Sequence, residues 1–164
     1  MIKKISILIL SMFSVGRSMY APGTVASFIT SLIFIFFYNF QVSVLVLIFG
    51  VSLIFIYSVY SIDAYKDYFN EIDSKEIVID ELVGQSIPIL TIYSLIGNNE
   101  IYNFIIYTVF SFALFRLFDI TKPYPINKID KHMKNGFGVM LDDVVAGIYA
   151  AVFLLIIFLF DNYV

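Results

Sequence analysis

The chain carries three groups of charged residues whose types suit phosphate chemistry assisted by a metal ion. Two of them are adjacent acidic pairs, and the third places two cations around one acid. Carboxylates are common Mg²⁺ ligands, and Arg and Lys bind phosphoryl oxygens. The residues are Asp80 and Glu81; Arg116, Asp119 and Lys122; and Asp142 and Asp143. Together they predict a site where a divalent cation and a phosphate meet.

The ligand types in the chain indicate which metal such a site would hold. The protein has no cysteine, and His132 is its only histidine. A zinc site takes mainly nitrogen and sulfur ligands, so zinc is not expected. Mg²⁺ binds one or two carboxylates together with phosphate oxygens and waters. We therefore predict that Asp80, Asp142 and Asp143 hold Mg²⁺, and that His132 is not catalytic.

Two further features could bind the phosphate itself. Arg116 can grip a phosphoryl group through two parallel hydrogen bonds, while Lys122 can act beside it as a point charge. The sequence APGT, residues 21–24, is typical of a helix start whose free backbone N–H groups can bind an anion. The predicted substrate-binding residues are therefore Gly23, Thr24, Ser27, Arg116 and Lys122. Alternatively, Arg116 only sets the membrane topology, and the Pro-Gly pair is only a turn.

The composition indicates that these groups sit in a membrane protein. The chain is 60% hydrophobic and only 14% charged, with a mean hydropathy of +0.92. Residues 18–62 contain no charge, a run too long for one crossing by a helix of roughly 20 residues. The most polar point of that run is residues 38–41, so we predict a turn there.

The apolar segments predict an all-α, polytopic membrane bundle of about five transmembrane helices in a single domain, residues 1–164. An additional apolar segment, residues 5–15, follows two lysines but lacks the cleavage site of a signal peptide. It is short for a crossing, so we expect it to be interfacial or re-entrant. The five predicted spans are residues 25–37, 42–62, 82–97, 101–118 and 144–160.

The positions of the basic residues predict the orientation. All ten Lys and Arg residues precede the first span, lie between the second and third, or lie between the fourth and fifth. Short loops rich in Lys and Arg remain in the cytoplasm. This arrangement places every candidate site residue at the cytoplasmic face of the membrane. A simpler alternative for Asp80 and Asp143 is that each merely caps the start of a helix.

Small residues follow each acidic pair and indicate how the pairs could meet. Gly84 comes one turn after Asp80, and Gly147 comes one turn after Asp143. Small residues allow membrane helices to approach closely. We expect the two helices to pack together there, although ordinary helix packing would explain both glycines equally well.

Four sequence blocks carry a resemblance to a known family. They are APGTVAS at residues 21–27, IVIDELVGQ at 77–85, FRLFDITKPYPI at 115–126 and NGFGVMLDDVVAG at 135–147. In order and spacing they resemble the phosphatidylglycerophosphatase A family of bacterial membrane enzymes. Three positions depart from the family pattern: Met19 stands where proline is common, and Ala26 and Asn135 where glycine is usual. Every acidic and basic candidate matches the pattern.

The resemblance implies a Mg²⁺-dependent phosphomonoesterase that converts phosphatidylglycerophosphate to phosphatidylglycerol in the bacterial cytoplasmic membrane. One mechanism uses Mg²⁺ to assist attack by water, with Asp119 as general base or a further ligand and Glu81 orienting the water. In the other, an aspartate attacks phosphorus and forms an aspartyl-phosphate. We favour attack by water, because the chain lacks the DxDx(T/V) setting of haloacid-dehalogenase-type phosphatases.

Two other functional classes are alternatives. A lipid-headgroup transferase of the CDP-alcohol type also uses clustered aspartates, but its DGxxAR…GxxxDxxxD pattern does not occur here. A small membrane transporter or scaffold would place ionisable groups in the middle of spans or along a cavity. The charged groups here gather at the predicted span ends, which favours the phosphatase.

Overall fold

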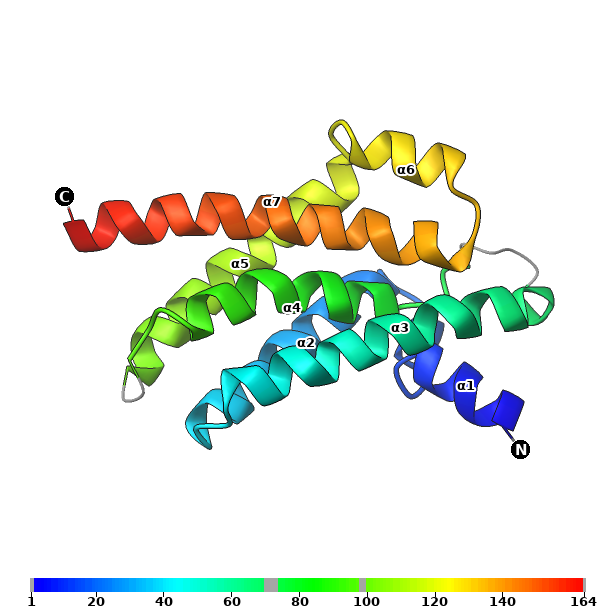
Figure 1. Cartoon of the computed structure of the whole chain (residues 1–164), viewed down its shortest axis with the longest axis horizontal. Helices are drawn as coiled ribbons and strands as arrows, with labels where there is room; N and C mark the ends of the chain where they lie inside the picture. Colours follow the sequence, from blue (N-terminus) through cyan, green and yellow to red (C-terminus); the bar gives the residue numbers. More distant parts are fainter. Residues whose placement is uncertain (1, 70–73, 98–99, 164) are drawn as a thin grey trace.

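The computed structural model describes residues 2–69, 74–97 and 100–163, and every regular element in these ranges is a helix. This confirms the predicted all-α class. Figure 1 shows the helices packed as a bundle. The elements are α1 (Ile2–Leu10), a short 3-10 helix η1 (Val15–Arg17), α2 (Pro22–Asn39), α3 (Val44–Phe69), α4 (Ile79–Tyr93), α5 (Ile101–Thr121), α6 (Ile126–His132) and α7 (Gly136–Tyr163).

Four helices, α2, α3, α5 and α7, are long and apolar enough to cross a membrane. They correspond to the first, second, fourth and fifth predicted spans. The third predicted span corresponds to α4, which has 15 residues and packs against all four of the others. At about 1.5 Å per residue it extends roughly 22 Å, less than the roughly 30 Å of a hydrocarbon core. The structure is consistent with a bundle of about five membrane helices in which α4 is the short, enclosed one.

The turn that separates the first two spans lies where the sequence predicts it. Helix α2 ends at Asn39, where the N–H of Phe40 donates to the carbonyl of Phe36. Gln41 then adopts a positive φ of 52°, and α3 begins at Val44. In Figure 1 this turn lies at the same end of the bundle as the C-terminus, while α1 and α6 lie at the other end.

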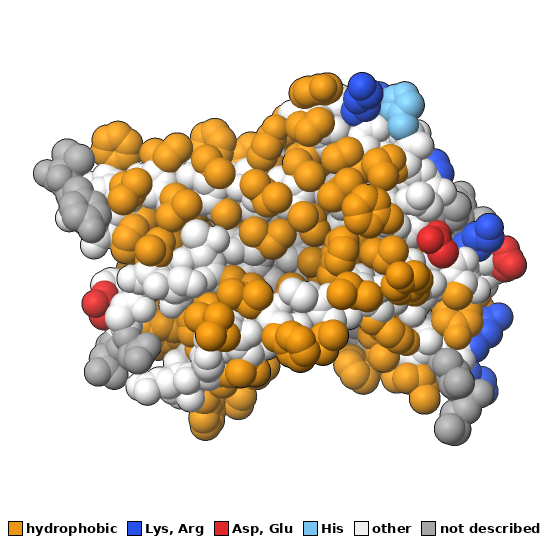
Figure 2. Space-filling model, viewed as in Figure 1, with side chains coloured by type: hydrophobic (Ala, Val, Ile, Leu, Met, Phe, Trp, Pro, Cys, Tyr) orange, Lys and Arg blue, Asp and Glu red, His pale blue; other side chains and the backbone are white. Residues whose placement is uncertain are grey.

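The charged residues separate from the apolar ones along the bundle axis. In the view of Figure 2, hydrophobic side chains cover the flank, and the visible Lys and Arg side chains gather at the end formed by α1 and α6. Large apolar side chains on α3 are openly exposed on this bundle, including Leu45 at 73% and Phe49 at 66%. Such an apolar flank is expected where lipid, not water, surrounds the protein.

Helix α7 begins earlier than the sequence predicts. We expected the last span to open beside Asp142 and Asp143, but the helix starts at Gly136. The side chain of Asn135 accepts the Gly138 N–H at 2.8 Å, and Asp63 of α3 accepts the Gly136 N–H at 2.6 Å, so these two groups satisfy the helix start. Asp143 therefore lies about two turns inside α7 and cannot be a helix cap. Asp80 does lie in the first turn of α4.

Helices α4 and α7 approach closely at the two glycines that the sequence singles out. A Cβ added at Gly147 would lie 2.3 Å from the carbonyl oxygen of Gly84, and one added at Gly84 would lie 2.7 Å from the carbonyl oxygen of Asp143. Both distances are far shorter than a normal contact. The close packing brings Asp143 beside the acidic first turn of α4.

We expect Gly147→Ala to destabilise the bundle by about 1–3 kcal/mol, because the added methyl group must push α4 and α7 apart. Gly50→Ala in α3 is the matched control, since a Cβ there meets no atom within 4 Å. Thermal unfolding of the purified variants in detergent measures the difference. Equal midpoints for the two variants would show that the contact tolerates a side chain.

The N-terminal segment does not form a span of its own. Helix α1 has nine residues, well below the roughly 20 needed to cross a membrane, and it packs against α3. The carbonyl of Leu10 accepts the N–H of Val78 at 3.0 Å, which joins this segment to the residue before α4. This agrees with the predicted interfacial or re-entrant segment.

Candidate active site

An open cavity of about 590 Å³ lies at the charged end of the bundle, and it gathers all three charged groups of the sequence. Helices α2, α4, α5 and α7 contribute to its walls, and so does the segment around η1. The predicted residues that line it are Gly23, Asp80, Glu81, Arg116, Asp119, Lys122, Asp142 and Asp143. The structure therefore brings every predicted acid and base to one place.

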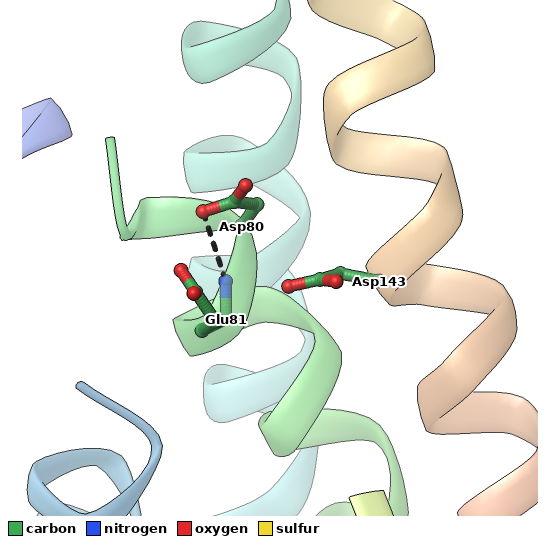
Figure 3. A group of neighbouring side chains, drawn as sticks. All are labelled: Asp80, Glu81 and Asp143. Carbon is green, nitrogen blue, oxygen red and sulfur yellow. Dashed lines mark hydrogen bonds between the residues drawn. The ribbon is translucent and has the colours of Figure 1, made fainter. Parts of the chain in front are cut away.

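Three of the acids form a compact cluster. Asp80 and Glu81 in the first turn of α4 and Asp143 on α7 each offer a carboxylate oxygen, and these oxygens lie within 4.8 Å of one another (Figure 3). Asp80 and Asp143 expose only 9% and 5% of their surface. The Glu81 N–H donates to Asp80 Oδ1 at 3.1 Å and helps to fix that carboxylate.

Two carboxylate oxygens of the cluster have no hydrogen-bond donor among the described residues. Glu81 Oε2 and Asp143 Oδ2 are buried and accept no hydrogen bond from the described residues. Burying a carboxylate oxygen without a partner is strongly unfavourable, and close carboxylates also repel one another. A bound cation would relieve both costs. The all-oxygen ligand set fits Mg²⁺.

Asp142 is oriented differently from its neighbour, because consecutive residues of a helix point about 100° apart. The ammonium group of Lys122 donates to Asp142 Oδ2 at 2.8 Å and to Asp130 Oδ1 at 2.9 Å. Burial lowers the pKa of Lys122, but the hydrogen bonds that its ammonium group donates to Asp142 and Asp130 outweigh burial, and the pKa lies above its ordinary value. Lys122 therefore stays positively charged at the cavity wall.

The structure thus groups the acids differently from the sequence prediction. Glu81, which we expected to act from outside the metal site, belongs to the cluster. Asp142, which we expected to be a ligand, pairs with Lys122 and lies outside the three-acid cluster, and its role as a metal ligand stays a prediction. Both acids still line the cavity.

Arg116 lies on α5 and points into the cavity with part of its hydrogen-bonding capacity unused. Its Nη1 atom forms an ion pair with Asp119 Oδ2 at 2.5 Å, one turn further along the helix. Its Nε atom is buried and has no hydrogen-bond partner among the described residues. A guanidinium group held in this way retains a donor for a phosphoryl oxygen.

The start of α2 touches both the acids and the arginine. Ala21 has a positive φ of 42°, and α2 begins at Pro22, as the sequence predicts. A Cβ at Gly23 would lie 1.9 Å from Glu81 Oε1 and 3.2 Å from Arg116 Nη1. A side chain at this position would have to displace the carboxylate of Glu81 from its place in the cluster.

The other two predicted substrate-binding residues of α2 do not line the cavity. The hydroxyl of Ser27 is buried and donates to the carbonyl of Gly23 at 2.9 Å. Thr24 is half-buried beside the cavity residues. A role for these two side chains in substrate binding stays a prediction.

Gly23→Ala should lower the turnover rate about 100-fold, since a displacement of about 1 Å at a reacting group can cost that much. The added methyl group must displace Glu81 from the acidic cluster. Initial rates of phosphate release measure the effect, with Gly50→Ala as the control for a glycine in open space. A wild-type rate in folded Gly23→Ala protein would show that the position of Glu81 is unimportant.

Ala21 and Pro22 of the predicted helix start also line the cavity, together with residues that were not among the predicted site residues: Gly16, Ser18, Met19, Ser74, Lys75 and Ile77. Residues 16–19 lie just before the APGT block, which could have drawn attention to them. With Lys75 included, five acidic residues face three basic ones. A phosphate monoester carries about 1.5 to 2 negative charges at neutral pH, so the net negative cavity would repel it unless a cation were also bound.

Comparison with known proteins decides the family. A family model described as Phosphatidylglycerophosphatase A matches residues 8–158, nearly the whole chain. The chain belongs to the phosphatidylglycerophosphatase A family. The match begins near the end of α1 and includes every residue that lines the cavity.

Individual relatives carry two different names. A protein of Bacteroides thetaiotaomicron, named "Putative phosphatidylinositol-3-phosphatase", is 33% identical over 141 residues, which cover 84% of each chain. Proteins named Phosphatidylglycerophosphatase A from Haemophilus influenzae and Escherichia coli are 45% identical over 80 residues and 33% identical over 79. Those two matches cover 49% and 48% of this chain, and 44% and 41% of the relatives. No solved structure is significantly similar to this chain.

Proposed function

We propose that the protein is a Mg²⁺-dependent membrane phosphatase that removes the terminal phosphate of phosphatidylglycerophosphate to give phosphatidylglycerol. The observation that carries the proposal is the cavity in which Asp80, Glu81 and Asp143 cluster beside Arg116 and Lys122. Its place at the charged end of an apolar bundle suits a substrate whose headgroup is polar and whose acyl chains stay in lipid. Family membership supports the same activity.

One set of residues would bind the metal, and another set would bind the phosphate. Asp80, Glu81 and Asp143 would hold Mg²⁺, which supplies charge neutralisation and an activated water when bound. Arg116 would donate to the phosphoryl oxygens, and Asp119, which pairs with Arg116, would accept a proton from the attacking water. Lys122, kept cationic by Asp142 and Asp130, adds positive charge at the cavity wall.

Hydrolysis of phosphate monoesters is among the slowest uncatalysed reactions, so the site must concentrate positive charge around the phosphoryl group. The protein supplies Arg116 and Lys122 for this purpose, and both already have acidic partners. Because each of these cations is already paired with an acid, the metal would supply the additional positive charge that the phosphoryl group requires. This division explains why so many acids line a site for an anionic substrate.

We further propose that the cavity faces the cytoplasm of a bacterial cell. The support is the gathering of Lys and Arg at that end of the bundle. The chain lacks cysteine, so single cysteines can be introduced and labelled. An impermeant thiol reagent outside intact cells should label Asn162→Cys and leave Lys131→Cys unlabelled. The opposite pattern would invert the orientation.

A substrate panel tests the activity. Purified protein with Mg²⁺ should release phosphate from phosphatidylglycerophosphate faster than from phosphatidic acid or a soluble phosphate monoester. Phosphatidylinositol 3-phosphate belongs in the panel because of the name of the Bacteroides relative. A preference for that lipid would support the phosphatase activity but identify phosphatidylinositol 3-phosphate as the substrate. Release from none of these compounds, in a folded preparation, would overturn the enzyme proposal in favour of a transporter or scaffold.

A further inference from the structure

A second cavity, of about 390 Å³, lies between α1, the segment that follows it and the charged end of α3. It shares no lining residue with the active-site cavity. Three cations and an aromatic hydroxyl stand around it together with serines and apolar side chains of α1. The lining residues are Lys3, Lys4, Ile7, Leu8, Ser11, Ser14, Arg17 and Tyr68.

Two of the three cations of this cavity, Lys3 and Arg17, contact Tyr68. The Lys3 ammonium lies 5.4 Å from the centre of the Tyr68 ring, and Arg17 Nη2 donates to the Tyr68 hydroxyl at 3.1 Å. The Arg17 Nε atom donates to Glu76 Oε2 at 3.1 Å. Glu76 pairs with Arg17, and among the described residues neither Lys3 nor Lys4 forms an ion pair with an acid. The cavity therefore carries an excess of positive charge and suits an anion.

The surroundings of the cavity indicate which kind of anion. Ile5, Leu8 and Phe13 on the same segment are openly exposed, Phe13 at 77%. Basic and apolar side chains combined on one short helix are typical of a segment that lies in the membrane interface. An anionic phospholipid would place its phosphate among the lysines and its acyl chains against the apolar side chains.

We propose that this cavity binds the headgroup phosphate of an anionic phospholipid that is not the lipid being hydrolysed. A short wall separates it from the active site: Gly16 of η1 lines the active-site cavity, and Arg17 lines this one. A Cβ at Gly16 would lie 2.0 Å from the Glu76 carbonyl, so the wall is tightly packed. A bound lipid would therefore hold the edge of the active site against the membrane surface. The proposal does not depend on the hydrolytic activity.

Native mass spectrometry of the full chain in detergent tests the proposal by measuring lipid binding. Phosphatidylglycerol is the probe, and phosphatidylcholine is the reference without net charge. A chelator is present throughout, so that the metal-free active site contributes little. The double variant Lys3→Gln/Lys4→Gln should bind phosphatidylglycerol about 30-fold more weakly, since each lysine near an anionic lipid surface contributes roughly fivefold. The matched control is Lys128→Gln/Lys131→Gln, which removes two exposed charges from α6.

Retention of phosphatidylglycerol in the control variant and its loss in the Lys3/Lys4 variant would support the site, provided that both variants unfold at the wild-type temperature. Equal affinity in the two variants would overturn it, because then only the total charge matters. Inorganic phosphate at millimolar concentration should not displace the lipid. Full displacement by phosphate would make the cavity a site for free phosphate and overturn the lipid assignment. Neither readout requires turnover, so the result is independent of the proposed phosphatase.

Discussion

Asp143→Asn should reduce the rate of phosphate release by about 1,000-fold, which corresponds to roughly 4 kcal/mol of transition-state stabilisation. The side chain keeps its size but loses the charge that would hold the metal. Asp80→Asn should have a similar effect, because both carboxylates belong to the same cluster. Asp67→Asn, an exposed acid at the charged end of α3, is the control and should keep the wild-type rate.

A binding measurement separates loss of metal from loss of structure in these variants. Mn²⁺ can replace Mg²⁺ as a paramagnetic probe, and its binding to the wild type should be at least about tenfold tighter than to Asp143→Asn, the loss expected for one carboxylate ligand. If Asp143→Asn instead retained both the wild-type rate and the wild-type Mn²⁺ affinity, Asp143 would not be a ligand.

Arg116→Lys should lower the rate by about 100-fold even though the positive charge is conserved. Lysine cannot make the two parallel hydrogen bonds that a guanidinium group offers to a phosphoryl oxygen pair. The loss of one such donor in an active site typically costs about 10²- to 10³-fold.

Arg116→Gln provides the comparison for Arg116→Lys, because it removes the charge as well. If charge alone mattered, the lysine variant would be close to the wild type and only the glutamine variant would be slow. If the guanidinium geometry matters, as we expect, both variants are slow. Circular dichroism and size-exclusion chromatography in detergent would check that the fold survives the loss of the ion pair with Asp119.

The sequence predicted most of the fold because lipid imposes simple rules on a membrane chain. Apolar length identified the helices, and the polar residues at Tyr38 and Asn39 marked the first turn. The small residues Gly84 and Gly147 correctly indicated where α4 and α7 meet. The convergence of the acidic and basic residues followed from the alternation of the spans across the membrane.

The start of α7 was missed for a physical reason. A stretch with two glycines, residues 136–138, favours a loop by local propensity. Its helical start is satisfied by Asn135 and by Asp63, which is remote in the sequence. Such a tertiary cap cannot be read from local sequence.

The grouping of the acids was equally hard to predict. In each adjacent pair the two carboxylates differ by about 100° around the helix, so the helix rotation decides which one faces a neighbour. Packing at Gly84 and Gly147 sets that rotation for α4 and α7. As a result Asp143 faces α4, while Asp142 meets Lys122. The partner Asp130 of Lys122 lies on α6, a helix that the apolar pattern did not indicate.

The most direct test of the account is phosphate release from phosphatidylglycerophosphate by the purified wild-type protein, followed through removal and return of the metal. The account predicts steady release with Mg²⁺, loss of at least about 99% of the rate after chelation, and recovery when Mg²⁺ is added back, because the acidic cavity repels the phosphate without a cation. Release that continues unchanged in the chelator would contradict the metal site formed by Asp80, Glu81 and Asp143.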